Sequence, residues 1–189
     1  MDTGLIILIV VAVLIVVGVM IYNRLVALRQ NANQAFADVD VQLKQRHDLI
    51  PNLVETVKGY ATHERGTLEA VIAARNAATA AGGVQQQAAA EGMLTQALGR
   101  LMALAEAYPD LKANTNFQQL QSELSDIENK LAAARRFFNN AVSEYNTGIQ
   151  QFPAVLFAGM FGFAHRDFFD VGVEDRKTLD TAPQVKFGA

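Results

Sequence analysis

A stretch of apolar residues near the N-terminus constrains the fold of this chain more than any other feature. Residues 5–21, LIILIVVAVLIVVGVMI, form a run of 17 residues without a charged or polar side chain. A helix needs roughly 17–25 such residues to cross a bilayer, and Gly4 and Tyr22 can extend the run at its ends. No Lys or Arg precedes the run, and no small-x-small cleavage site follows it, which disfavours a cleaved signal peptide.

We therefore expect residues 5–22 to form a retained transmembrane helix, with residues 1–4 as a short segment outside the membrane. The residues expected to span the bilayer include Leu5, Ile9, Val13, Val17 and Ile21. Arg24 and Arg29 follow the run, whereas the N-terminal flank carries Asp2. The positive-inside rule then predicts a single-pass protein with its N-terminus outside and its C-terminal domain in the cytoplasm.

Charge and cysteine content narrow the classes of function. The formal net charge is −3 and the sequence pI is about 5.6, so the whole protein has no positive field to attract nucleic acid. The chain contains no cysteine, which excludes disulfides, thiolate zinc sites and thiol nucleophiles. We expect no nucleic-acid partner.

The pattern after the span predicts an all-α fold in which the transmembrane helix continues into a long antiparallel helical bundle at residues 23–151. Apolar residues recur at steps of three and four through residues 25–60, and the pattern is lost at residues 77–83, where we expect the first turn. A second helix is indicated near residues 93–105. A heptad seam predicts a third helix over residues 115–150, so three long helices are expected.

The segment that follows is unusually apolar and aromatic. Its residues 152–170 contain the candidate contacts for assembly or for the membrane: Phe152, Phe157, Phe161, Phe163, Phe168 and Phe169. About 12 consecutive apolar residues are too few to span a bilayer, so the segment caps the bundle, lies in the membrane interface or contacts another subunit. Residues 171–189 are predicted to form a loose polar tail.

Residues that could carry chemistry are sparse. No histidine stands three residues after a glutamate, as di-iron bundles require, and HExxH, GxSxG and phosphate-binding glycine motifs are missing. His47 with Asp48, and His63 with Glu64, are interpreted as surface residues because neighbours on a helix do not face one another. Asn139, Asn140, Tyr145 and Asn146 are hypothesised to set helix register or to bridge subunits. We expect no catalytic residues, metal or cofactor.

The stretch DVQLKQRHDLIPNLVETVKGYA closely resembles the signature region of the LemA family. Similar stretches follow at YPDLKANTNFQQLQSEL, ENKLAAARRFFNNAVSEYN and IQQFPAVLFAGMFGF. In this motif Asp48, Pro51 and Asn52 are expected to mark a helix kink, since proline removes a backbone hydrogen bond and clashes near the carbonyl of His47. The resemblance implies a bacterial inner-membrane protein with a long-helix domain on the inner side. One branch of the family is associated with building magnetosome membranes.

Two functions fit these observations. The first is a non-enzymatic scaffold, bound to the lipid bilayer, that self-associates into a homo-oligomer and organises or remodels the bacterial inner membrane. The second is a membrane-bound adaptor whose helical surface recruits an unknown protein partner such as a protease, a transporter or a signalling protein. Homotypic cross-links in cells would favour the scaffold, and a reproducible heterotypic cross-link would favour the adaptor.

Overall fold

The structure is a computed structural model, and it describes residues 3–61 and 63–170. Within these residues every regular element is a helix, which confirms the predicted all-α class. In chain order they are α1 (Thr3–Lys58), α2 (Arg65–Ala80), α3 (Val84–Ala105), α4 (Pro109–Lys112), α5 (Thr115–Gln150) and the short 3-10 helix η1 (Ala154–Leu156). The predicted tail at residues 171–189 lies outside the described part of the chain.

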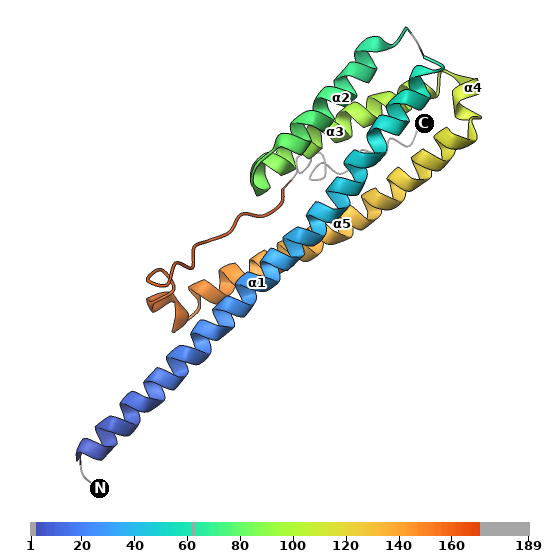
Figure 1. The fold of residues 1–189 in the computed structure, drawn as a ribbon. Coiled ribbons are helices and arrows are strands. Elements are labelled where there is room, and N and C mark those ends of the chain that lie inside the picture. The colour runs from blue at the N-terminus through green and yellow to red at the C-terminus, as the bar shows by residue number, and fades with distance from the viewer. Residues whose placement is uncertain (1–2, 62, 171–189) are drawn as a thin grey trace, which may run out of the picture. The chain divides into compact units, whose positions relative to one another are not determined.

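Helix α1 carries the apolar run and continues without interruption for 56 residues (Figure 1). Its most apolar window has a mean hydropathy of 3.4, and none of that window is buried by other parts of the described chain. By length and composition it is the one described helix that could cross a membrane. Pro51 lies inside α1, and the expected kink at this residue stays a prediction.

Residue contacts divide the chain into two units, and helices α1 and α5 contribute to both. The first unit contains the part of α1 up to Val41 together with Ala132–Asp167. The second contains Gln42–Leu131 and residues 168–170. The candidate membrane span and the aromatic segment therefore belong largely to the first unit, and the bundle core belongs to the second.

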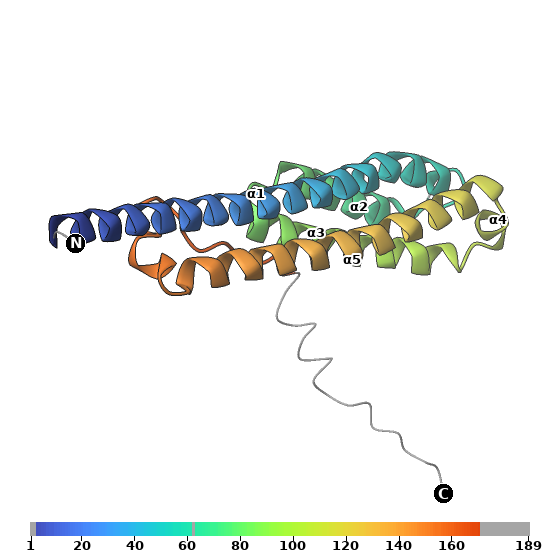
Figure 2. The same ribbon diagram turned by 90° about the horizontal axis from the view of Figure 1, so that it is seen from below.

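The second unit packs four longer helical stretches and the short α4, rather than the three long helices that we expected. Arg75 of α2 contacts His47, and Arg46 contacts Glu91 of α3 and Glu128 of α5, so α1 is paired with three helices. Figures 1 and 2 show α2 and α3 side by side. The shared core includes Ile50, Leu53, Val57, Leu68, Val71, Leu94, Leu98, Leu101, Leu111, Phe117 and Leu124.

The predicted first turn is correct in part only. The chain first leaves α1 at Gly59, before residues 77–83, and then begins α2 at Arg65. Leu68 and Val71 can reach the same core as Val57 only if the chain reverses here. Burial of these side chains stabilises the reversed chain more than continuation of α1 along the same apolar pattern would. The glutamine run after Gly83 is the first turn of α3, which therefore begins before residue 93.

The first unit pairs the two helices in antiparallel directions. Phe36 of α1 lies against Phe138 of α5, with 5.3 Å between ring centroids, and nearer the membrane span Leu28 approaches Gly148. A Cβ atom at Gly148 would lie 2.7 Å from Cδ1 of Leu28 and 3.5 Å from Cδ2 of Leu25. Glycine thus lets α5 approach α1 closely, directly before the chain turns into η1.

Replacing Gly148 with leucine should separate α1 from the end of α5. Overpacking of a fitted contact costs about 1–3 kcal/mol, so the free energy of unfolding in urea should fall by that amount. Gly148→Ala is the matched control, because only the flexible end of Leu28 must move and alanine favours helix by about 0.5–1 kcal/mol. Equal stability of the leucine and alanine variants would contradict the close packing.

Candidate functional site: a membrane-proximal aromatic cluster

Four aromatic side chains meet where the apolar run of α1 ends. We call Tyr22, Phe157, Phe161 and Phe163 the aromatic cluster. The ring centroid of Tyr22 lies 5.3 Å from that of Phe161 and 5.6 Å from that of Phe163, both in edge-to-face orientation. Phe157 meets Phe161 at 6.1 Å in the same orientation. Tyr22 thus joins the end of the span to the C-terminal segment through favourable ring contacts.

Hydrogen bonds from α5 fix the backbone that follows this cluster. The hydroxyl of Tyr145 donates to the carbonyl of Ala164 at 2.9 Å. The side-chain amide of Asn146 donates to the carbonyl of Arg166 and accepts from its backbone N–H, both at 2.9 Å. Tyr145 and Asn146 are both buried, so the bonds are shielded from water. The segment is therefore held in one geometry although most of it is not helical.

Tyr145 and Asn146 are two of the four polar residues of α5 for which the sequence suggested a role, and these bonds give them a different one. Tyr145 and Asn146 were expected to set register or bridge subunits, and within the chain they bind the backbone of residues 164–166. A cluster of amide and phenol groups on a heptad helix was the available signal. It could not name the partner, because the partner is a backbone segment about 20 residues further along the chain.

Burial divides the aromatic segment into two sets of side chains. Phe163 and Phe169 are buried, as are Ala154 and Ala158. By contrast, Phe152 is 80% exposed, Leu156 68% and Met160 84%, and Phe161 and Phe168 are also exposed. The first set is covered by other parts of the described chain, while the second set remains available for lipid or for another protein. We call Phe152, Leu156 and Met160 the outer face.

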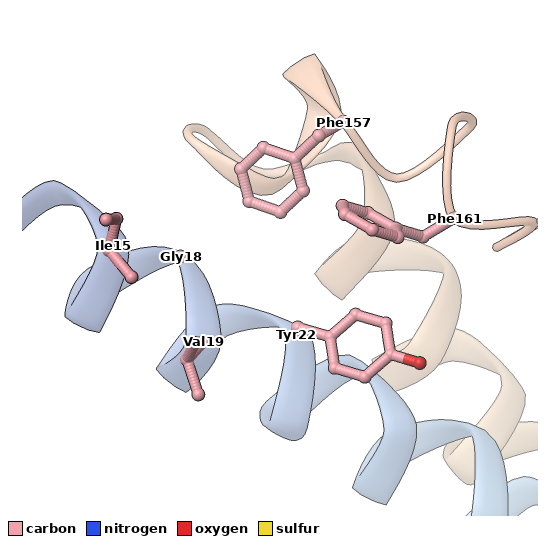
Figure 3. A pocket seen from close by; sticks show the side chains of 6 residues that line it. All are labelled: Ile15, Gly18, Val19, Tyr22, Phe157 and Phe161. Carbon is pink, nitrogen blue, oxygen red and sulfur yellow. The ribbon is translucent and has the colours of Figure 1, made fainter.

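A cavity of about 500 Å³ lies between α1 and the aromatic cluster. Ile15, Gly18, Val19 and Tyr22 form its wall on α1, and Phe157 and Phe161 form the wall on the segment. Figure 3 shows both phenylalanine rings facing the stretch of α1 that carries Gly18. Apart from the phenol of Tyr22, the side chains that line this groove are hydrocarbon.

Two arginines of α1 follow the span. Arg24 is exposed, and the guanidinium carbon of Arg29 lies 5.0 Å from the ring centroid of Phe163. This distance allows a cation–π contact, which joins the aromatic cluster to the second arginine after the apolar run. Positive charge beside an aromatic layer is typical of the inner membrane–water interface.

The second unit contains a buried polar network that contradicts part of the sequence analysis. His47 was interpreted as a surface residue, yet it is 7% exposed and its Nε2 lies 2.6 Å from Oε1 of Glu91. Arg46 donates to Glu91 at 2.8 Å, to Thr95 at 3.0 Å and to Glu128 at 2.7 Å. Adjacent residues of a helix do not face each other, but a carboxylate on a third helix can accept from both.

The three motif residues form no site with this network. Asp48, Pro51 and Asn52 lie on one exposed face of α1, where Asp48 pairs with Lys44 at 3.0 Å. His63 and His165 are exposed. Among residues 3–61 and 63–170, no group of three His, Cys, Asp or Glu side chains is placed to hold a metal ion.

Comparisons with known sequences identify similar proteins. The profile described as LemA family matches residues 35–187. Magnetosome protein MamQ of Magnetospirillum gryphiswaldense is 25% identical over 174 residues, which cover 78% of this chain and 64% of the relative. Magnetosome proteins MamQ 1 and MamQ 2 of Paramagnetospirillum magneticum match with the same identity and coverage. The chain thus spans less than two thirds of the length of these relatives.

Removing one partner of the buried network should destabilise the protein strongly. Arg46→Met leaves Glu91 buried without its cation, which costs about 3–5 kcal/mol in the free energy of unfolding. Lys44→Met, two residues earlier on α1, breaks an exposed pair and should cost about 0–1 kcal/mol. Urea unfolding followed by circular dichroism measures both. A loss for Arg46→Met no larger than that for Lys44→Met would show that the network does not hold the bundle.

Proposed function

The chain belongs to the LemA family, and from this premise we propose that it is a non-enzymatic, membrane-anchored scaffold that self-assembles and organises the bilayer to which it is bound. The N-terminal candidate membrane helix indicates anchoring, and the remainder of the described chain is helical. Self-assembly and membrane organisation are the steps that we propose beyond this.

The outer face is the observation that carries the proposal. Phe152, Leu156 and Met160 are each at least two thirds exposed, and Leu156 and Met160 directly precede Phe157 and Phe161 of the aromatic cluster. Large apolar side chains grouped on a surface mark sites of protein or membrane contact. Hydrogen bonds from Tyr145 and Asn146 hold the segment in place, so its ordering cost is already met before a neighbour binds.

The continuity of α1 supports a mechanical role. One helix carries the apolar run, then Tyr22 of the aromatic cluster, and later the buried Arg46 and His47. Between the apolar run and Val41 this helix contains no proline, so it transmits position and tilt from lipid to the part of the first unit outside the membrane, which a flexible linker does not. Such a link lets contacts between neighbouring copies act on the bilayer.

The relatives and the use of buried polar groups also support organisation rather than catalysis. The relatives are called magnetosome proteins. In the second unit charged side chains are paired between helices: Glu91 accepts from Arg46 and contacts His47. A buried network of this kind specifies which helices pair rather than presenting a reactive group to a substrate.

Full-length protein in nanodiscs should form particles with several times the 20.5 kDa chain mass. Phe152→Ser with Met160→Ser should reduce them to single copies, because both changes remove exposed apolar surface without opening the buried core. Met93→Ser on α3 is the control, since Met93 is 54% exposed outside this segment. Light scattering measures the mass.

A strictly monomeric wild-type protein at micromolar concentration in nanodiscs would contradict the scaffold proposal. Cross-linking in cells then decides what replaces it. A reproducible band with one other protein would support an adaptor that recruits this partner, whereas homotypic bands that disappear in the Phe152→Ser, Met160→Ser variant would support assembly.

The predicted orientation can be tested with single cysteines, because the chain has none of its own. Thr3→Cys should react with a membrane-impermeant maleimide in spheroplasts, since the positive-inside rule places the N-terminus outside. Met93→Cys should react only after the membrane is permeabilised. The reverse labelling pattern would place the helical domain outside the cytoplasm.

A further inference from the structure

We propose that the groove between α1 and the aromatic cluster binds one acyl chain of a bilayer phospholipid. This inference rests on the membrane anchoring in the proposed function but not on self-association. The ligand is defined by its chemistry, which is an extended hydrocarbon chain supplied by the surrounding leaflet.

The depth of the groove along α1 points to lipid. Ile15, Gly18, Val19 and Tyr22 follow one another at helical steps of three, four and seven from Ile15, so they line one face. Ile15 precedes Tyr22 by seven residues, which is about 10 Å along a helix. Because residues 5–21 are the apolar run, the groove extends from the membrane surface into the hydrocarbon region.

The shape and the lining also select an apolar occupant. The cavity holds about 500 Å³, within the range of roughly 300–1,000 Å³ that is typical of ligand sites. Backbone groups of α1 are bonded within the helix, and the only polar side-chain atom of the lining is the Tyr22 hydroxyl. A water molecule needs two to four polar partners to be stable in a cavity, so hydrocarbon fits this groove better than water.

A second copy of the span fits the groove less well than a lipid chain. Helices that associate within a membrane usually bring small residues together at a spacing of four. The small residues of the apolar run are Ala12 and Gly18, which are six apart. Side chains from Leu5 to Met20 are exposed on all sides of α1, apart from the half-buried Gly18, so they form no single stripe for a partner helix.

Gly18 provides a way to fill the groove without disturbing α1. A Cβ atom at Gly18 would have no other heavy atom within 4 Å, so a side chain there can extend into the cavity. Gly18→Leu should exclude about two methylene groups of the bound chain and weaken its retention roughly tenfold. Gly4→Leu is the matched control, because its Cβ is equally free and it lies near the other end of the run.

The 189-residue chain has no tryptophan, so the fluorescence of a single introduced tryptophan reports only on the groove. Phe157→Trp is reconstituted in vesicles of phosphatidylethanolamine and phosphatidylglycerol, with bromine on the acyl chains of a fraction of the lipid. Bromolipid should quench Trp at 157 strongly and aqueous iodide weakly. Gly18→Leu should reduce the bromolipid quenching while Gly4→Leu leaves it unchanged, and Phe161→Trp serves as a second reporter.

Three results would each overturn the proposal. Strong quenching by iodide at both reporters would mean that the groove is filled with water. Weak quenching by both agents would mean that protein covers it, with a second copy as the occupant. Equal bromolipid quenching in the Gly18→Leu and Gly4→Leu proteins would mean that the ring meets bulk lipid only. The particle mass in nanodiscs is measured separately, so failure of self-assembly does not affect this test.

Discussion

The arrangement of the first unit depends on the need to cover the apolar part of α1. Within the described chain no residue of its most apolar window is buried. A membrane supplies hydrocarbon for it, and the helix satisfies its own backbone hydrogen bonds there. The end of the span then fixes the position of Tyr22, and through Tyr22 the position of the aromatic cluster.

The two units differ in which side chains they bury and which they expose. In the second unit charged groups are taken inside and paired, so that Arg46 joins α1 to Glu91 on α3 and Glu128 on α5. In the first unit large apolar groups remain outside, on the span and on the outer face. The buried charged pairs of the second unit specify which helices pair within the chain. The exposed apolar side chains of the first unit form a surface that lipid or another protein can cover. The proposed function is based on this surface.

Much of the fold could be predicted from local patterns. The third predicted helix coincides with α5, Thr115–Gln150, because the heptad period of this stretch is unbroken. The apolar run was sufficient to predict the first part of α1. The turn after Lys58 was missed, because Gly59 alone is a weak signal and the apolar period continues across it. The turn is determined by the packing of α2 on the shared core. This packing involves residues far apart in the sequence, so a local pattern does not reveal it.

The site was predictable in composition but not in geometry. Aromatic residues after residue 151 marked the segment, yet the sequence could not separate the buried Phe163 from the exposed Phe152. The division depends on hydrogen bonds from Tyr145 and Asn146, whose partners lie far along the chain. His47 was misjudged for the same reason, since the residues that contact it, Glu91 on α3 and Thr79 on α2, lie on other helices.

The continuity of α1 from lipid into the extramembrane domain is the central claim, and one distance tests it most directly. Spin labels at Val13→Cys and Gln34→Cys are separated by 21 residues, which in a continuous helix corresponds to about 32 Å. Double electron–electron resonance of the full-length protein in nanodiscs should give one narrow distribution near this value. A broad or clearly shorter distribution would contradict the claim, because it would show a flexible joint between the membrane span and the helix that follows it.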